Sequence, residues 1–202
     1  MPTGTPIQDI REQLFRATER VLLRDGADAV TSRAVTTEAA VAKGILHRHF
    51  PDFEVFLAAF ALTQIEKLDV LSRQLRAAAG TGSVVGNLAD ALIEALTPTA
   101  IRSITLISSR EKLLTRLRLA TPTGIPIAAE TTKMIAAYLT AERGLGRIPI
   151  DTDADALAII LVGGAHLRAT EHDDLELAHP ELADLLTTAI GASTNDQAHQ
   201  PT

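Results

Sequence analysis

Three basic side chains and two histidines lie close together near the N-terminus. Arg33, Lys43 and Arg48 fall in one short segment, and His47 and His49 flank Arg48. Arginine and lysine neutralise phosphate groups and donate hydrogen bonds to guanine edges, and histidine can also hydrogen-bond phosphate. The chemistry that these residue types offer is contact with a polyanion.

Two short helices are predicted to position these side chains. Thr31 can cap a helix over residues 32–39, a break follows at 40–42, and a second helix covers 43–49. A longer helix is expected before them at 7–24, and another after Asp52 at 53–79. Two short helices joined by a tight turn form a helix-turn-helix, which presents its second helix to the major groove of DNA.

The rest of the chain also shows helical spacing of apolar residues, with no sustained alternation typical of strands. We therefore predict an all-α fold. All five phenylalanines lie in the first 60 residues, and the remainder is rich in Leu, Ile, Val and Ala. Two regions with different cores are expected. The further helices are predicted at 84–96, 99–107, 110–120, 125–143, 152–170 and 180–191.

The charge distribution places the acidity far from the basic segment. The net charge is −6, and ten acidic residues follow from position 151 onward against the single Arg168. The absence of cysteine excludes disulfides and thiolate chemistry. The N-terminal residues lack the features of a signal peptide, and no apolar run is long enough to span a membrane. We expect a cytoplasmic protein.

The order of residues 31–51 resembles the DNA-binding signature of the tetracycline-repressor (TetR) family. That signature runs Thr-x-x-x-Ile-Ala, Ala-Gly-Val-Ser-x-Gly and x-Leu-Tyr-x-His-Phe, and the match spans residues 10–60. Here the corresponding segments are Thr31-Ser-Arg-Ala-Val35, Ala39-Ala-Val-Ala-Lys43 and Gly44-Ile-Leu-His-Arg-His-Phe50-Pro51.

The resemblance implies three parts: a DNA-binding domain at 1–51, a helical ligand-binding and dimerisation domain at 52–191, and a disordered tail at 192–202. It also implies a homodimeric transcriptional regulator, expected to be a repressor, that a small molecule releases from operator DNA. No cofactor, metal or catalytic residue is expected. Carried over by position, the resemblance predicts DNA contacts for Ser32, Arg33, Lys43, Gly44, Ile45, His47, Arg48 and His49.

Four positions depart from the family pattern. Ala40 replaces the turn glycine, Ala42 replaces a serine that would cap the next helix, and His47 replaces tyrosine. Phe53 stands where a lysine usually meets phosphate. A lost serine cap costs about 1 kcal/mol, and a lost phosphate contact weakens DNA affinity. The DNA-facing positions therefore match the family less closely than the apolar frame.

The C-terminal region is expected to supply a dimer interface and a ligand cavity, as the family does. In the family the last two long helices form the interface. The corresponding residues are Leu157, Ile160, Leu161, Gly164, Leu167, Leu182, Leu185 and Leu186. The predicted cavity residues are Leu92, Leu96, Arg116, Leu117, Met134, Tyr138 and His166. Since aromatic residues are few, an apolar or mixed ligand is favoured over a stacked planar one.

Two other functions compete with this interpretation. An enzyme is disfavoured because the chain has no phosphate-binding glycine loop, Gly-x-Ser-x-Gly or His-Glu-x-x-His motif. The acidic run at residues 171–176 offers only a weak cation site. The second alternative is a TetR-like ligand-binding or protein-interaction module with weakened DNA binding. Specific binding to a DNA sequence would distinguish a regulator from such a module.

Overall fold

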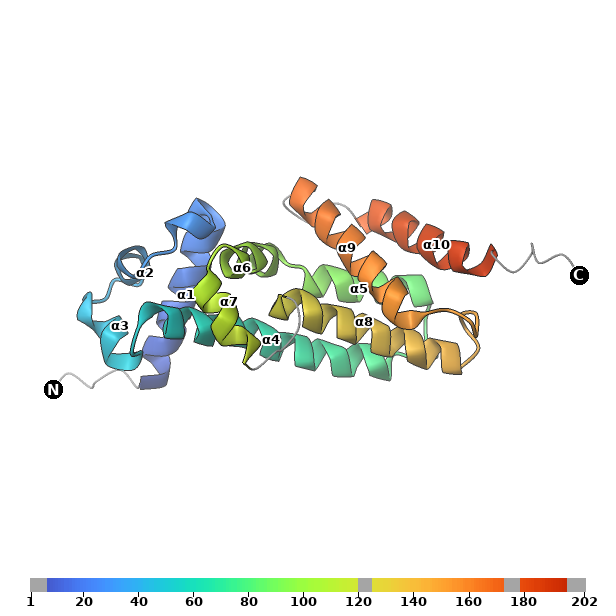
Figure 1. Ribbon diagram of the computed structural model, residues 1–202, viewed down its shortest axis with the longest axis horizontal. Coiled ribbons are helices and arrows are strands. Elements are labelled where there is room, and N and C mark those ends of the chain that lie inside the picture. The colour runs from blue at the N-terminus through green and yellow to red at the C-terminus, as the bar shows by residue number, and fades with distance from the viewer. Residues whose placement is uncertain (1–6, 120–124, 173–178, 196–202) are drawn as a thin grey trace, which may run out of the picture. The chain divides into compact units, whose positions relative to one another are not determined.

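The structure is a computed structural model that describes residues 7–119, 125–172 and 179–195. Every regular element in these ranges is a helix (Figure 1), so the all-α prediction is confirmed. The elements are α1 (Ile7–Asp25), the 3₁₀ helix η1 (Ala27–Ala29), α2 (Ser32–Glu38), α3 (Gly44–His49), α4 (Phe53–Ala77), α5 (Val84–Ala95), α6 (Pro98–Ser108), α7 (Glu111–Arg118), α8 (Pro126–Gly144), α9 (Ala154–His172) and α10 (His179–Asn195).

The predicted helix boundaries differ from these by a few residues at most. The largest difference is at α10, which continues to Asn195, beyond the predicted end at 191. Residues 192–195 of the expected tail are therefore helical, and 196–202 lie outside the described residues. Most of the acidic run at 171–176 also lies outside them. No group of acidic and histidine side chains in the described ranges could hold a metal ion.

The chain packs as two compact units. The first unit contains residues 1–64 and 102–125, and the second contains 65–101 and 126–202. The units are not consecutive stretches, because a segment from the middle of the sequence packs with the N-terminal helices. Helices α4 and α6 each contribute residues to both units.

Side-chain caps explain where several helices begin. The Thr31 hydroxyl accepts a hydrogen bond from the backbone N–H of Ala34 at 3.1 Å, at the start of α2. Asp52 does the same for Val55 at 2.7 Å, at the start of α4. Each cap satisfies a backbone donor that has no partner within its own helix. The cap residues expected from the sequence thus mark the starts of α2 and α4.

An aromatic cluster forms the core of the first unit. The ring of Phe15 on α1 lies 5.6–6.2 Å from the rings of Phe50, Phe56 and Phe60. Phe50 and Phe56 meet edge to face at 5.0 Å. Such pairs add about 0.5–1.5 kcal/mol each to the energy of burial. The cluster therefore joins α1, the residue after α3 and the first part of α4.

The second unit has an aliphatic core with one buried tyrosine. Leu92, Leu139 and Leu161 are fully buried, from α5, α8 and α9 respectively. Tyr138 is also buried, and its hydroxyl accepts a hydrogen bond from Asn87 Nδ2 at 2.9 Å. The expectation of two different cores is met. Among the described helices, none alone is long and apolar enough to cross a membrane, and one bent pair, α5 with α6, meets that criterion together.

Candidate nucleic-acid interface

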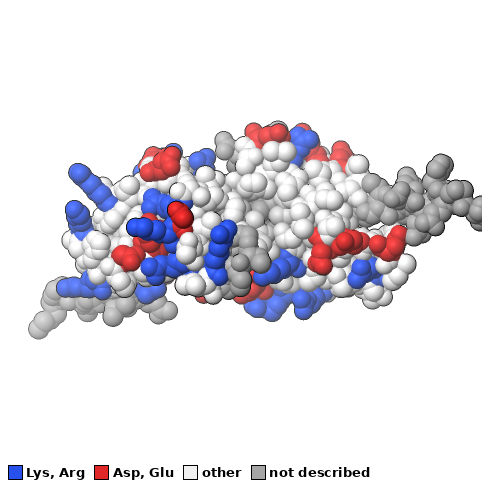
Figure 2. All heavy atoms as spheres, viewed as in Figure 1, with Lys and Arg blue, Asp and Glu red and all other residues white. Residues whose placement is uncertain are grey.

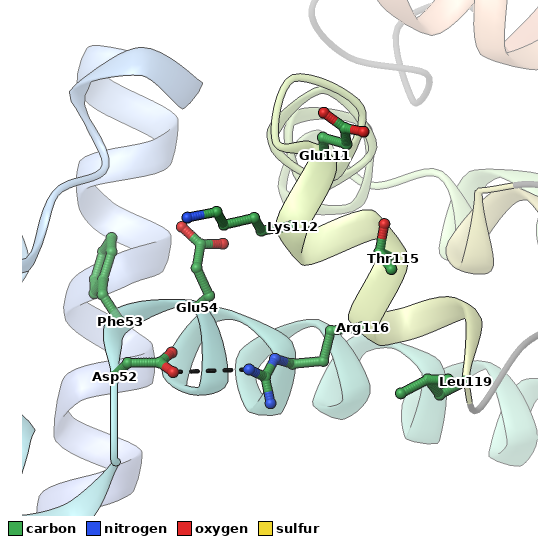
Figure 3. Close-up of a pocket in the computed structure, with 8 residues that line it drawn as sticks. All are labelled: Asp52, Phe53, Glu54, Glu111, Lys112, Thr115, Arg116 and Leu119. Atoms are coloured by element: carbon green, nitrogen blue, oxygen red, sulfur yellow. Dashed lines mark ion pairs between the residues drawn. The ribbon is translucent and has the colours of Figure 1, made fainter.

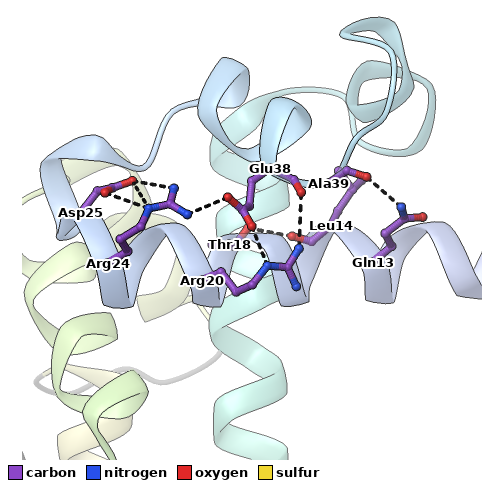
Figure 4. Close-up of polar contacts among 8 residues, drawn as sticks. All are labelled: Gln13, Leu14, Thr18, Arg20, Arg24, Asp25, Glu38 and Ala39. Carbon is purple, nitrogen blue, oxygen red and sulfur yellow. Dashed lines mark hydrogen bonds and ion pairs between the residues drawn. The ribbon is translucent and has the colours of Figure 1, made fainter.

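The C-terminal end of α2 is held against α1 by several polar contacts (Figure 4). Arg20 Nε and Arg24 Nη1 of α1 pair with the two carboxylate oxygens of Glu38, at 2.6 and 2.9 Å. Gln13 Nε2 donates to the carbonyl of Ala39 at 2.8 Å. These contacts hold the last turn of α2 and the start of the following turn in one position on α1.

The same contacts also change the charge balance of this surface. Hydrogen bonds from Arg20 and then Arg24 hold the pKa of Glu38 below its usual value. Hydrogen bonds to Asp25 and Glu38 raise the pKa of Arg24 in turn. The one acidic group on α2 is thereby neutralised by α1, which removes a source of repulsion toward a polyanion.

The turn between α2 and α3 contains a strained residue. Among the described residues, Ala40 is the non-glycine residue with a positive φ, at 53°. This left-handed region costs about 1–2 kcal/mol for a residue with a Cβ. It explains why the family pattern has glycine here. The backbone of this chain takes the left-handed conformation although alanine stands there.

Helix α3 has an apolar side and an exposed polar side. Leu46 and Phe50 are buried, as expected, and no side chain caps the first turn at Lys43, as the replacement of serine by Ala42 suggested. Lys43, Gly44, His47 and Arg48 are exposed, and Ile45 and His49 are partly exposed. A Cβ placed on Gly44 would meet no atom within 4 Å, so the backbone there is open to close approach.

The exposed cations of α2 and α3 have no ion-pair partner among the residues that the structure describes. Arg33, Lys43 and Arg48 form no ion pair with any residue in the described ranges, whereas Arg16, Arg20 and Arg24 of α1 all do. Figure 2 shows Lys and Arg side chains, with acidic ones between them, over the end that carries these helices. The hydroxyl oxygen of Ser32 is buried and has no hydrogen-bond partner among the described residues, and its predicted DNA contact stays a prediction.

Comparison with known families agrees with this geometry. The model for "Bacterial regulatory proteins, tetR family" matches residues 14–60, which run from α1 through the first turns of α4. Residues 14–60 therefore carry a DNA-binding segment of the tetR type. The matched segment includes the aromatic cluster and both helices of the helix-turn-helix. The comparison with curated protein sequences gave no significant match.

Solved structures share the fold of this chain over nearly its full length. A transcriptional regulator of Pseudomonas aeruginosa PAO1 is 15% identical, with a TM-score of 0.67 over 96% of this chain and 95% of that one. Salmonella enterica GusR is 16% identical, with a TM-score of 0.69 over 93% and 98%. Bacillus subtilis FadR, solved with stearoyl-CoA, is 14% identical, with a TM-score of 0.64 over 89% and 98%.

The predicted cavity residues fall in both compact units. Leu92, Leu96, Met134 and Tyr138 are buried in the second unit, and His166 is partly exposed there. Burial raises the pKa of Tyr138 to about 12, together with a hydrogen bond to Glu142. Arg116 and Leu117 belong to the first unit instead.

An open pocket of about 830 Å³ lies in the first unit, between the first turn of α4 and α7 (Figure 3). Arg116 lines it and pairs with Asp52 at 3.7 Å. The next residue in the sequence, Leu117, is buried and does not line the pocket. The pocket is lined by Asp52, Phe53, Glu54, Glu111, Lys112, Thr115, Arg116 and Leu119. Arg116 is thus the one predicted cavity residue that lines this pocket.

The residues predicted for the dimer interface divide by burial. Leu157, Leu161, Leu182 and Leu186 are buried within the subunit. Gly164 allows α10 to approach α9, since a Cβ there would lie 3.0 Å from the side chain of Leu185. Ile160 and Leu167 are 60% and 59% exposed, and Ile159 and Gly163 are exposed on the same side of α9. We call these four exposed residues the outer face of α9.

Sequence reasoning did not identify one residue that touches the helix-turn-helix. Arg110 lies between α6 and α7, yet its Nη2 donates to the carbonyl of Val30 at 2.6 Å, just before the cap of α2. The two residues are 80 positions apart. No periodicity or motif marks an arginine in a short connection, so the sequence held no signal for this contact.

The strain at Ala40 gives a prediction about stability. Replacing Ala40 with glycine should raise the free energy of unfolding by up to about 1 kcal/mol. The substitution relieves about 1–2 kcal/mol of strain and loses about 0.4–1 kcal/mol through the more flexible unfolded chain. Urea denaturation of the full chain measures the difference.

Ala34→Gly, within α2, is the matched control and should lower the same free energy by about 0.5–1 kcal/mol. If Ala40→Gly destabilises the protein as much as Ala34→Gly does, the left-handed turn is not the conformation in solution.

Proposed function

We propose that this protein is a TetR-family repressor in the cytoplasm that binds operator DNA as a homodimer through α2 and α3. The observation that carries the proposal is the set of unpaired cations on a helix pair whose neighbouring arginines are all engaged. Lys43, His47 and Arg48 are the residues that we assign to the major groove, and Arg33 is assigned to phosphate. Gly44, Ile45 and His49 border this surface, and a DNA contact from Ser32 stays a prediction.

The proposed dimer forms through the outer face of α9. One helix-turn-helix buries too little surface for useful specificity, so such modules act in pairs on two-fold operators. A large exposed apolar surface on a helix is also typical of a protein interface. We propose that a second copy of the chain binds this face, because a two-fold symmetric operator is bound by two identical DNA-binding domains.

We propose that an apolar or mixed small molecule lowers the affinity for DNA. The buried residues of the second unit that we assign to it are Leu92, Leu96, Met134 and Tyr138, with His166 as a polar neighbour. Support comes from FadR, which shares the fold and was solved with stearoyl-CoA. Since α4 contributes to both units, it is the element we assign to the coupling. Release requires that the ligand bind more tightly to a form that does not fit DNA. In this proposal the protein is not an enzyme.

The assignment of the groove residues is tested by single substitutions. Lys43→Ala and Arg48→Ala should each weaken binding to DNA from around the protein's own gene by about tenfold or more, because a good base contact contributes about 1–3 kcal/mol. A gel shift at one stated salt concentration measures the affinity. The dimer should be unchanged in both variants.

Arg118→Ala on α7 is the matched control, because Arg118 is exposed and forms no ion pair in the described ranges. It should bind DNA as the wild type does. Wild-type affinity in the Lys43 and Arg48 variants would show that α3 is not the reading surface. Failure of the wild type to bind any DNA above the non-specific level would favour a ligand-binding module instead.

The dimer is tested on the outer face of α9. Ile160→Glu and Leu167→Glu should each convert the dimer to a monomer, because a charge would be buried without a partner. Sedimentation equilibrium gives the mass. Ile150→Glu is the control in the same unit, since Ile150 is 80% exposed and lies outside α9. A wild-type monomer, or dimers of unchanged stability in both α9 variants, would contradict the proposed interface.

A further inference from the structure

Arg110 contacts both sides of the helix-turn-helix from a distant part of the sequence. Its Nη2 donates to the carbonyl of Val30 at 2.6 Å, and its Nη1 pairs with Glu54 Oε1 at 3.2 Å. Its guanidinium also lies 5.6 Å from the centre of the Phe53 ring. Val30 precedes the cap of α2, and Phe53 and Glu54 begin α4. One side chain therefore joins the residues before α2 to those after α3.

The environment of this arginine makes its contacts stronger than those of an exposed pair. The Arg110 and Glu54 side chains are 24% and 26% exposed. By comparison, the Arg16–Glu12 pair on α1 is 66% and 59% exposed. Exposed pairs contribute little, whereas partly buried ones are less screened by water and salt. The planar guanidinium also holds its donors in a fixed fork while its face lies over a ring, whereas an ammonium group is a compact charge without this planar geometry.

The contacts of Arg110 complement those at the other end of α2. Arg20, Arg24 and Gln13 hold the C-terminal end of that helix to α1. Arg110 holds the residue that precedes its N-terminal cap. The position of α2 is thus fixed at both ends, and only one end is fixed by residues within the segment that matches the family model.

We propose that Arg110 is a positioning residue for α2 and α3, and that the connection between α6 and α7 is thereby a working part of the DNA-binding unit. This inference rests on the proposed function. Arg110 acts through Val30 and Glu54, and it does not touch DNA. Loss of its side chain leaves the exposed cations in place, but releases the start of α2 from the start of α4.

The test compares Arg110→Gln with Arg118→Gln in the full-length protein. Arg110→Gln should lower the affinity for DNA about tenfold, while the slope of log affinity against log salt stays that of the wild type. The slope counts phosphate contacts, and no phosphate contact is removed. Hydrogen exchange of backbone amides in residues 27–50 should become faster in the same variant. Arg118→Gln should leave affinity, slope and exchange unchanged.

Arg110→Lys separates the charge from the geometry. It keeps a cation near Glu54 but cannot reach Val30 at the same time, so it should resemble Arg110→Gln in both measurements. If Arg110→Gln does not fold, Arg110→Lys carries the test alone.

Three results would overturn the inference. One is wild-type affinity together with wild-type exchange in the Arg110 variants. The second is a salt slope reduced by about one, which would mean that Arg110 contacts phosphate directly. The third is wild-type affinity and exchange in Arg110→Lys, which would mean that only the positive charge of Arg110 matters. If the wild-type protein itself binds no DNA, the proposed function fails, and hydrogen exchange still decides whether Arg110 holds α2.

Discussion

The attachment of α2 to its neighbours is the interaction on which the rest of the proposed DNA-contact surface depends. Arg20 and Arg24 hold Glu38 at one end of the helix, and Arg110 holds Val30 at the other. The first pair of contacts has two effects. It fixes the helix, and it neutralises a carboxylate that would otherwise repel phosphate. The same groups therefore set both the position of α2 and the charge near it, while Arg33, Lys43 and Arg48 form no ion pair within the described residues.

The aromatic core explains how α3 is stable although the residues at its start favour a helix only weakly. This helix has no side-chain cap, and the turn before it contains the strained Ala40. Helices this short are not stable alone, and packing must stabilise them. Leu46 and Phe50 supply that packing, with Phe50 in contact with Phe15 and Phe56. Tertiary packing thus offsets the missing cap of α3 and the strain at Ala40, and the helix forms in spite of both.

The sequence predicted the helices and the exposed side of α3 well, because both follow from local spacing. It did not predict which side of α9 is buried. That helix is apolar on nearly all sides, so Leu161, which is buried, and Leu167, which is exposed, look alike in the sequence. The contact from Arg110 to Val30 joins residues 80 positions apart. Local patterns carry no information about such a pair, and only the folded chain brings the two together.

In the proposed function, α3 is the element that reads DNA, in two copies related by symmetry. The most direct measurement is selection of bound sequences from a pool of random double-stranded DNA by the wild-type protein at a stated salt concentration. If a symmetric dimer reads DNA through α3, we expect enrichment of two inverted half-sites whose centres lie about one helical turn apart, or a multiple of it. A pool that shows no enriched sequence, while the protein is folded and dimeric, would contradict sequence-specific DNA binding by α3.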